Sequence, residues 1–72
     1  MNKDDIQALI QAGLPNARVT VLGDDGQHFE AEVVCADFAG RTPVAQHRMV
    51  YATLGEKMGR EIHALKLTTR AA

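Results

Sequence analysis

The spacing of apolar residues near the amino terminus predicts an amphipathic helix. Ile6, Leu9 and Ile10 fall on one helical face, at positions i, i+3 and i+4. Asn2 suits the N-cap position, where its side-chain oxygen can accept a backbone N–H. Gly13 suits the left-handed residue just past the last helical turn. The pattern therefore predicts a helix of about ten residues that ends near Gly13.

Two strands joined by a tight turn are predicted next. Residues 18–22 read as a strand with valine at alternate positions. The segment Gly23–Gly26 contains two glycines and two aspartates, a composition typical of a turn. From His28 to Cys35, apolar and polar side chains alternate, which predicts one covered face and one face in water. These segments together predict a hairpin.

The second half of the chain predicts a crossover helix and a last strand. Thr42-Pro43 fits a helix start, with threonine as the N-cap and proline in the first turn. We expect this helix to end at Gly59, and Gly55 leaves open whether it bends or splits in two. Residues 62–68 form an apolar run that predicts a strand. The apolar stripe of the helix consists of His47, Val50, Tyr51, Leu54 and Met58.

The order of these elements indicates one small α+β domain over residues 1–72. A strand–helix–strand connection strongly favours parallel neighbours, so we expect the last strand to run parallel to the second. Both strands then begin at the same edge of the sheet. His28 opens one strand and His63 lies near the start of the other. If the strands are direct neighbours, the two imidazoles share that edge.

Histidine is the natural candidate for chemistry at this edge, because imidazole binds borderline metals and titrates near neutral pH. Neighbouring strands lie about 4.8 Å apart, close enough for two histidines to reach one ion. His28 and His63 would supply half of a four-ligand site, so the other ligands would come from another molecule. The ordinary alternative stays open: a half-buried His63 bonded to backbone and an exposed His28. The face of the sheet on which each histidine lies also stays open. His63 alternates in phase with the apolar Leu65, whereas His28 is out of phase with the apolar Phe29.

Composition narrows the classes of function. Eight basic and nine acidic residues give a net charge of −1, so no field of one sign attracts nucleic acid or anionic lipid. The single cysteine, Cys35, falls in the apolar phase of its strand, and a lone thiol fits a reducing compartment. No window resembles a signal peptide or a membrane span, so a cytoplasmic location is expected. No nucleophile is spaced beside a base, which argues against an enzyme.

A basic cluster around the second helix start supports a competing hypothesis, nucleic-acid binding. Arg41 and Arg48 flank this start, and Gly40 would allow a phosphate to approach the backbone. Thr42 and His47 complete the candidate surface. With a net charge near zero, such binding would be weak and sensitive to salt.

Four segments occur in an order that resembles the BolA-like protein family, and the short bacterial IbaG type is the nearer match. The resemblance covers nearly the whole chain. It implies an α-β-β-α-α-β fold similar to a type II KH domain, with a three-stranded mixed sheet covered by helices on one face. The segments are Asp25-Gly26-Gln27-His28-Phe29, Phe38-Ala39-Gly40-Arg41, His47-Arg48-Met49-Val50-Tyr51 and Ile62-His63-Ala64-Leu65.

The resemblance also implies a partner rather than a substrate. Proteins of this family form a complex with a monothiol glutaredoxin that bridges a [2Fe-2S] cluster, with glutaredoxin and glutathione supplying thiolates. The family's cluster histidine corresponds to His63, and the second ligand, before the second strand, corresponds to His28. No cofactor is expected in the isolated protein. Family members have also been called transcription regulators, and His47 and Arg48 match the His-Arg pair on which that description rests.

Two features depart from the family patterns. Gly55 and Gly59 enclose three residues, whereas the clamp of true KH domains encloses two. Gln46 stands where many relatives have arginine.

Overall fold

The first helix follows the predicted bounds in the computed structural model, which describes residues 1–72. Helix α1 spans Lys3–Gly13. The Asn2 side chain accepts the Asp5 backbone N–H at 2.9 Å, and the Asp5 carboxylate accepts the Asn2 backbone N–H at 3.1 Å. This reciprocal pair satisfies two N–H groups that the helix itself leaves without partners. The apolar face of α1 buries Ile6 and Ile10 completely.

The end of α1 corrects one prediction. Gly13 is the last helical residue and does not adopt a left-handed conformation, and Leu14 caps the helix with a φ of −130°. A Cβ atom added at Gly13 would lie 2.5 Å from Cγ2 of Thr53 in the other long helix. The missing side chain therefore allows two helices to approach, and it does not serve a backbone turn.

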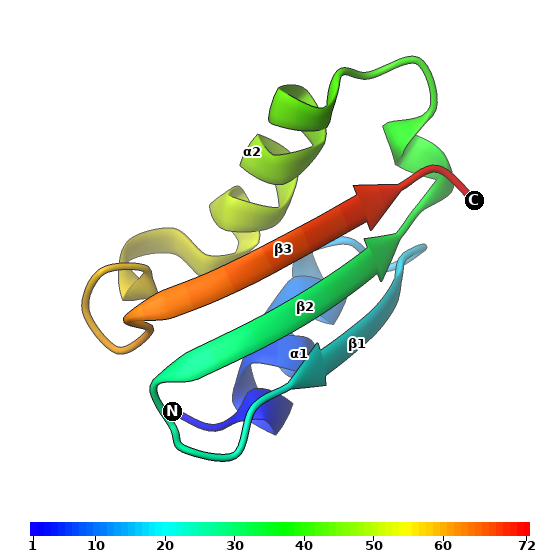
Figure 1. The fold of residues 1–72 in the computed structure, drawn as a ribbon. Coiled ribbons are helices and arrows are strands. Elements are labelled where there is room, and N and C mark those ends of the chain that lie inside the picture. Colours follow the sequence, from blue (N-terminus) through cyan, green and yellow to red (C-terminus); the bar gives the residue numbers. More distant parts are fainter.

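Three strands form one sheet in the order β1-β2-β3 (Figure 1). Strand β1 spans Arg18–Leu22 and pairs antiparallel with β2, which spans His28–Val34. Strand β3 spans Ala64–Arg70 and pairs parallel with β2. The predicted hairpin and the predicted parallel return are both confirmed.

Strand β3 begins two residues later than the predicted strand over residues 62–68. Ile62 is fully buried but belongs to the preceding loop. Its N–H donates to the Lys57 carbonyl, and its carbonyl accepts the Gly59 N–H, both at 2.9 Å. Because these groups are occupied within the loop, they do not join the sheet. His63 therefore lies just before β3 and not inside it.

The crossover between β2 and β3 contains one long helix and two short ones. A 3-10 helix at Ala36–Phe38 precedes α2, which spans Pro43–Leu54. A second 3-10 helix follows at Gly55–Lys57. The predicted break at Gly55 is confirmed, and its φ of +57° lies in the region that favours glycine. The additional helix of the family pattern is here a single 3-10 turn.

Both α1 and α2 cover the same face of the sheet, and the core lies between the helices and that face (Figure 1). Cys35 is completely buried, as predicted. Tyr51 was expected in the apolar stripe but remains 36% exposed, because the buried face of α2 runs through Val50 and Leu54. The core consists of Ile6, Ile10, Leu14, Ala17, Val19, Val21, Phe29, Ala31, Val33, Cys35, Phe38, Val50, Leu54 and Ile62.

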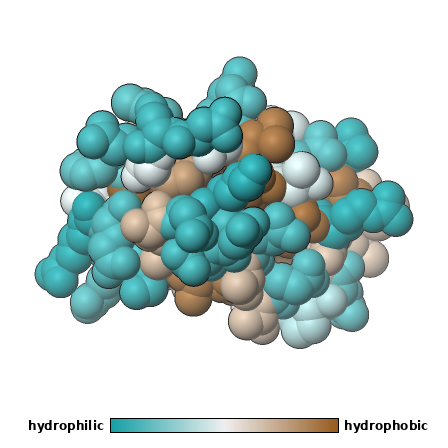
Figure 2. All heavy atoms as spheres, turned by 90° about the horizontal axis from the view of Figure 1, so that it is seen from below, coloured by the Kyte–Doolittle hydropathy of each residue, from teal (hydrophilic) through white to brown (hydrophobic).

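The face of the molecule seen in Figure 2 is mainly hydrophilic. In Figure 2, which views the molecule from the side of the β1–β2 turn, hydrophobic atoms reach the surface in small areas between hydrophilic side chains. Neither α1 nor α2 has the length and apolar character that crossing a lipid bilayer requires.

Candidate functional site

The two candidate histidines lie at the same end of the sheet. His28 opens β2 and pairs with Ala64, which opens β3. The Ala64 N–H donates to the Gln27 carbonyl at 3.2 Å, so the peptide groups next to the two histidines are directly bonded. His63 immediately precedes Ala64. The topology therefore brings the histidines together as predicted, while their role as metal ligands stays a prediction.

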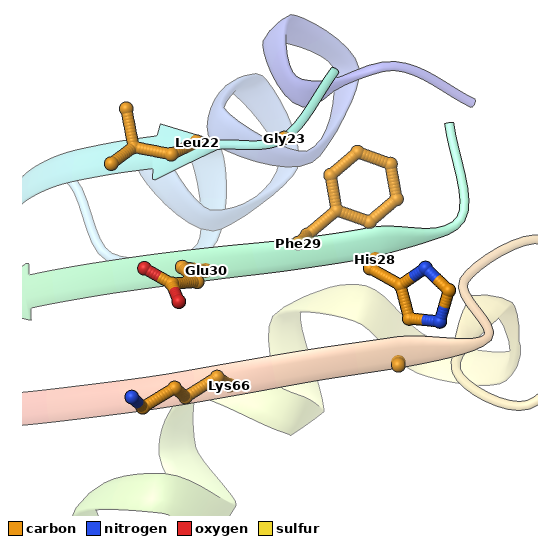
Figure 3. A pocket seen from close by; sticks show the side chains of 7 residues that line it. Leu22, Gly23, His28, Phe29, Glu30 and Lys66 are labelled. Atoms are coloured by element: carbon orange, nitrogen blue, oxygen red, sulfur yellow. The ribbon is translucent and has the colours of Figure 1, made fainter. Parts of the chain in front are cut away.

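The sheet pairing settles on which face His28 lies. Its neighbour Phe29 is buried beneath the helices, whereas the His28 side chain is 71% exposed on the uncovered face. The imidazole leans toward the start of β3 (Figure 3). It borders a shallow hollow of about 410 Å³, whose other lining residues are Leu22, Gly23, Phe29, Glu30, Ala64 and Lys66. His63 is also exposed. The alternative of a half-buried His63 is therefore wrong, and both rings are open to a docking molecule.

Asp25 holds the His28 ring in place, and it is a site residue that was not predicted from the sequence. Its Oδ2 lies 2.8 Å from Nδ1 of His28. Its Oδ1 accepts the backbone N–H groups of Gln27 at 2.9 Å and of His28 at 2.8 Å. The sequence offers only a partial signal: a turn aspartate often accepts the backbone N–H two residues on, as Asp25 does from Gln27, but Asp24 fits the same pattern.

Hydrogen bonding, and not burial, sets the acidity of this carboxyl group. The pKa of Asp25 is held well below its usual range, first by the backbone N–H of His28, then by the His28 side chain and the backbone N–H of Gln27. A carboxylate that accepts several such bonds is favoured in its ionised form. Asp25 is therefore a fixed negative charge that accepts hydrogen bonds beside the imidazole.

Residues 1–72 do not by themselves form a complete metal site at this edge. No three His, Cys, Asp or Glu side chains within residues 1–72 come together in a way that could hold a metal. The only thiol, Cys35, is buried at the other end of β2, where its backbone N–H bonds to Arg70. The chain thus offers two imidazoles, and a four-ligand site would need further donors from another molecule.

The candidate nucleic-acid surface lies at the opposite end of the sheet, around the start of α2 (Figure 1). Gly40 has a φ of +76° and open space around it. The Arg41 Nε donates to the Asp37 carbonyl at 3.0 Å, and the Thr42 hydroxyl accepts the Ala45 N–H at 3.1 Å as the predicted N-cap. Both side chains therefore already form hydrogen bonds within the protein, Arg41 to the preceding loop and Thr42 to the first turn of α2.

The two other residues of that surface differ in exposure. Arg48 is exposed and forms no ion pair, whereas His47 is half-buried, in agreement with its place in the predicted apolar stripe. Arg48 is consequently the most available cation of this candidate surface.

Gln46, the departure from the family pattern, has a structural task. Its Nε2 donates to the carbonyls of Phe38 at 3.2 Å and Arg41 at 3.0 Å. Its Oε1 accepts the Thr69 hydroxyl at 2.7 Å. One side chain thus ties the loop before α2 to strand β3.

Comparisons with known proteins agree on one family. The family model for BolA-like protein matches residues 11–72. A solved structure of a bolA protein homologue from Coxiella burnetii is 46% identical, with a TM-score of 0.84 over 96% of this chain and 88% of that one. Protein BOLA2 of Arabidopsis thaliana is 37% identical over 93% of this chain and 74% of its own length.

A third relative has a functional name. The DNA-binding transcriptional regulator BolA of Vibrio cholerae is 48% identical over 42 residues. This match covers 58% of the present chain and 40% of the Vibrio protein. The similarity therefore concerns less than half of that protein.

Proposed function

Because the chain belongs to the BolA-like family, we propose that it is a non-enzymatic partner protein, which shares a [2Fe-2S] cluster with a monothiol glutaredoxin and glutathione. One observation carries the proposal. His28 and His63 lie at one exposed end of the sheet. The residues next to them are joined by a backbone hydrogen bond, from the Ala64 N–H to the Gln27 carbonyl. No thiol of this chain is available there, so the donor set calls for thiolates from a partner.

In this proposal the chain contributes two imidazole nitrogens and an open surface. His28 and His63 donate the nitrogens, and the exposed end of the sheet leaves room for a protein partner. Two imidazoles hold iron poorly without further ligands, so we expect the isolated protein to carry no cluster. A cluster with mixed imidazole and thiolate ligands has a higher reduction potential than one with thiolates alone.

The proposal is tested by mixing the protein with a monothiol glutaredoxin, glutathione, ferrous iron and sulfide. We expect wild-type protein to change the visible absorption and circular dichroism of the glutaredoxin cluster. His63→Ala should abolish the change, and His28→Ala should weaken or abolish it. His47→Ala is the matched control, because that histidine lies on α2 and away from the edge. An unaltered cluster spectrum on adding the wild-type protein would sink the proposal.

A second candidate function is nucleic-acid binding by Gly40, Arg41, Thr42, His47 and Arg48. The name of the Vibrio relative and the unpaired, exposed guanidinium of Arg48 favour it. Titration of duplex DNA at two salt concentrations provides the test, because phosphate contacts weaken as salt rises. Binding that is lost in Arg48→Ala and retained in His63→Ala would support this function. Equal binding by both variants would argue against it.

A further inference from the structure

The turn before β2 fixes both the position and the orientation of one carboxylate. Oδ1 of Asp25 accepts two backbone N–H groups, those of Gln27 and His28. Gly26 supplies the positive φ of +75° in this turn. With Oδ1 bound twice to the backbone, the carboxylate plane cannot rotate freely. Oδ2 is consequently directed at Nδ1 of His28, at 2.8 Å.

We propose that Asp25 is a positioning residue that keeps the proton of neutral His28 on Nδ1 and leaves Nε2 as the ligand atom. The proposal rests on the proposed function and assigns a residue to it. It concerns the order of events: the ring is prepared for binding in the free protein, before any partner arrives.

The donor and acceptor roles of the two groups determine which ring nitrogen carries the proton. A neutral imidazole has one N–H donor and one nitrogen acceptor, and an ionised carboxylate can only accept. A bond between Nδ1 and the Asp25 carboxylate therefore requires the proton on Nδ1. The lone pair of Nε2 then remains available. Carboxylates placed in this way behind a ligating histidine fix its tautomer and ring orientation and raise its basicity.

The two histidines differ in this respect. No side-chain hydrogen bond in the structure involves His63. Its ring can choose either tautomer, and a partner must orient it. His28 is the prepared ligand and His63 is the adaptable one.

The decisive variant is Asp25→Asn, because it should move the proton of His28 from Nδ1 to Nε2 without removing the turn. The amide oxygen can still accept the backbone N–H groups of Gln27 and His28, which fixes the orientation of the amide. The NH₂ group then replaces Oδ2 and donates to Nδ1 of His28. Nδ1 becomes an acceptor, and the proton moves to Nε2, where it blocks the proposed ligand atom. Asp24→Asn is the matched control, since the Asp24 side chain makes no hydrogen bond in the structure.

The first measurement is made on the free protein and needs no cluster. Long-range nitrogen–proton correlation spectra identify the protonated ring nitrogen of a neutral imidazole, and they are recorded at rising pH until they no longer change. We expect Nδ1–H for His28 in wild type and in Asp24→Asn, and Nε2–H in Asp25→Asn. A neutral histidine free in water favours Nε2–H, so the wild-type result is diagnostic. Nε2–H in the wild type, or an unchanged tautomer in Asp25→Asn, would overturn the proposal.

The second measurement uses the glutaredoxin complex. Loss of a group behind a metal ligand typically costs about 10–100-fold in metal affinity. We expect Asp25→Asn to need at least tenfold more protein than wild type to reach the same change in the cluster spectrum. Binding of Asp25→Asn as tight as wild type would refute the positioning role. If wild type shows Nδ1–H but never alters the cluster spectrum, the proposed function fails while the control of the tautomer by Asp25 stands.

Discussion

Replacing Gly13 by alanine should destabilise the fold, although alanine is the better helix former. The added Cβ would lie 2.5 Å from Cγ2 and 2.8 Å from Cβ of Thr53. Carbon atoms in packed interiors approach to about 3.5–4.0 Å, so α1 and α2 would have to move apart. Thr53 cannot rotate away freely, because its hydroxyl donates to the Val50 carbonyl at 2.6 Å.

The size of the effect comes from two opposing contributions. An added methyl group in a tight helix contact costs about 1–3 kcal/mol, as in other overpacked sites. The gain in helix propensity from glycine to alanine is at most about 1 kcal/mol, and it is smaller at the last helical residue. We therefore expect Gly13→Ala to lower the free energy of unfolding by about 1–2 kcal/mol. For a domain of this size, each kcal/mol lowers Tm by about 4–8 °C.

Urea and thermal unfolding, followed by far-ultraviolet circular dichroism, measure this change. Ala12→Gly is the matched control, because it changes propensity alone at an exposed neighbouring position and should cost about 1 kcal/mol. Adding Thr53→Ser removes Cγ2 but keeps the hydroxyl, so Gly13→Ala with Thr53→Ser should recover part of the loss. A Gly13→Ala protein as stable as wild type, or more stable, would refute the close approach of the helices.

Three further predictions concern hydrogen bonds outside the core. Asn2→Ala removes the N-cap of α1 and should lower the free energy of unfolding by about 1 kcal/mol, measured in urea. Gln46→Leu leaves two loop carbonyls and the Thr69 hydroxyl without their partner, and a loss of about 1–3 kcal/mol is expected in the same assay. The lowered pKa of Asp25 in the folded protein means that its stabilisation is complete above the unfolded pKa, about 3.9, and is lost as the pH falls through the lower folded value. Wild type should therefore exceed Asp25→Ala in urea stability at pH 6, and the difference should shrink below about pH 4; a constant difference down to pH 2 would contradict this linkage.

Most of the fold could be predicted from the periodicity of the sequence, because each element has one buried face. Strand β1 was predicted with its observed bounds, and β2 to within one residue. The start of β3 was predicted wrongly, since Ile62 is as apolar in a buried loop as it would be in a strand. The left-handed conformation of Gly13 was also predicted wrongly, for a similar reason. Freedom of the backbone and close approach of another helix both select glycine, and the second depends on a contact with Thr53 forty residues away.

The site was predictable in its location but not in its detail. A parallel connection brings the starts of β2 and β3 together, and this rule needs no knowledge of side chains. The bond between Asp25 and His28 was not predictable, because Asp24 and Asp25 are adjacent and chemically alike. Only the path of the turn decides which carboxylate receives the backbone N–H groups and reaches the imidazole.

The different anchoring of the two histidines has a consequence for how a partner could bind. His28 is fixed by its strand, by its backbone bond to Asp25 and by the bond at Nδ1, so it loses little freedom when it binds. His63 precedes β3 and lacks a side-chain partner, so ordering its ring costs entropy at the moment of docking. If a partner docks as proposed, its own contacts must offset that cost. Complex formation should therefore tolerate small changes in the position of the partner at His63 far better than at His28.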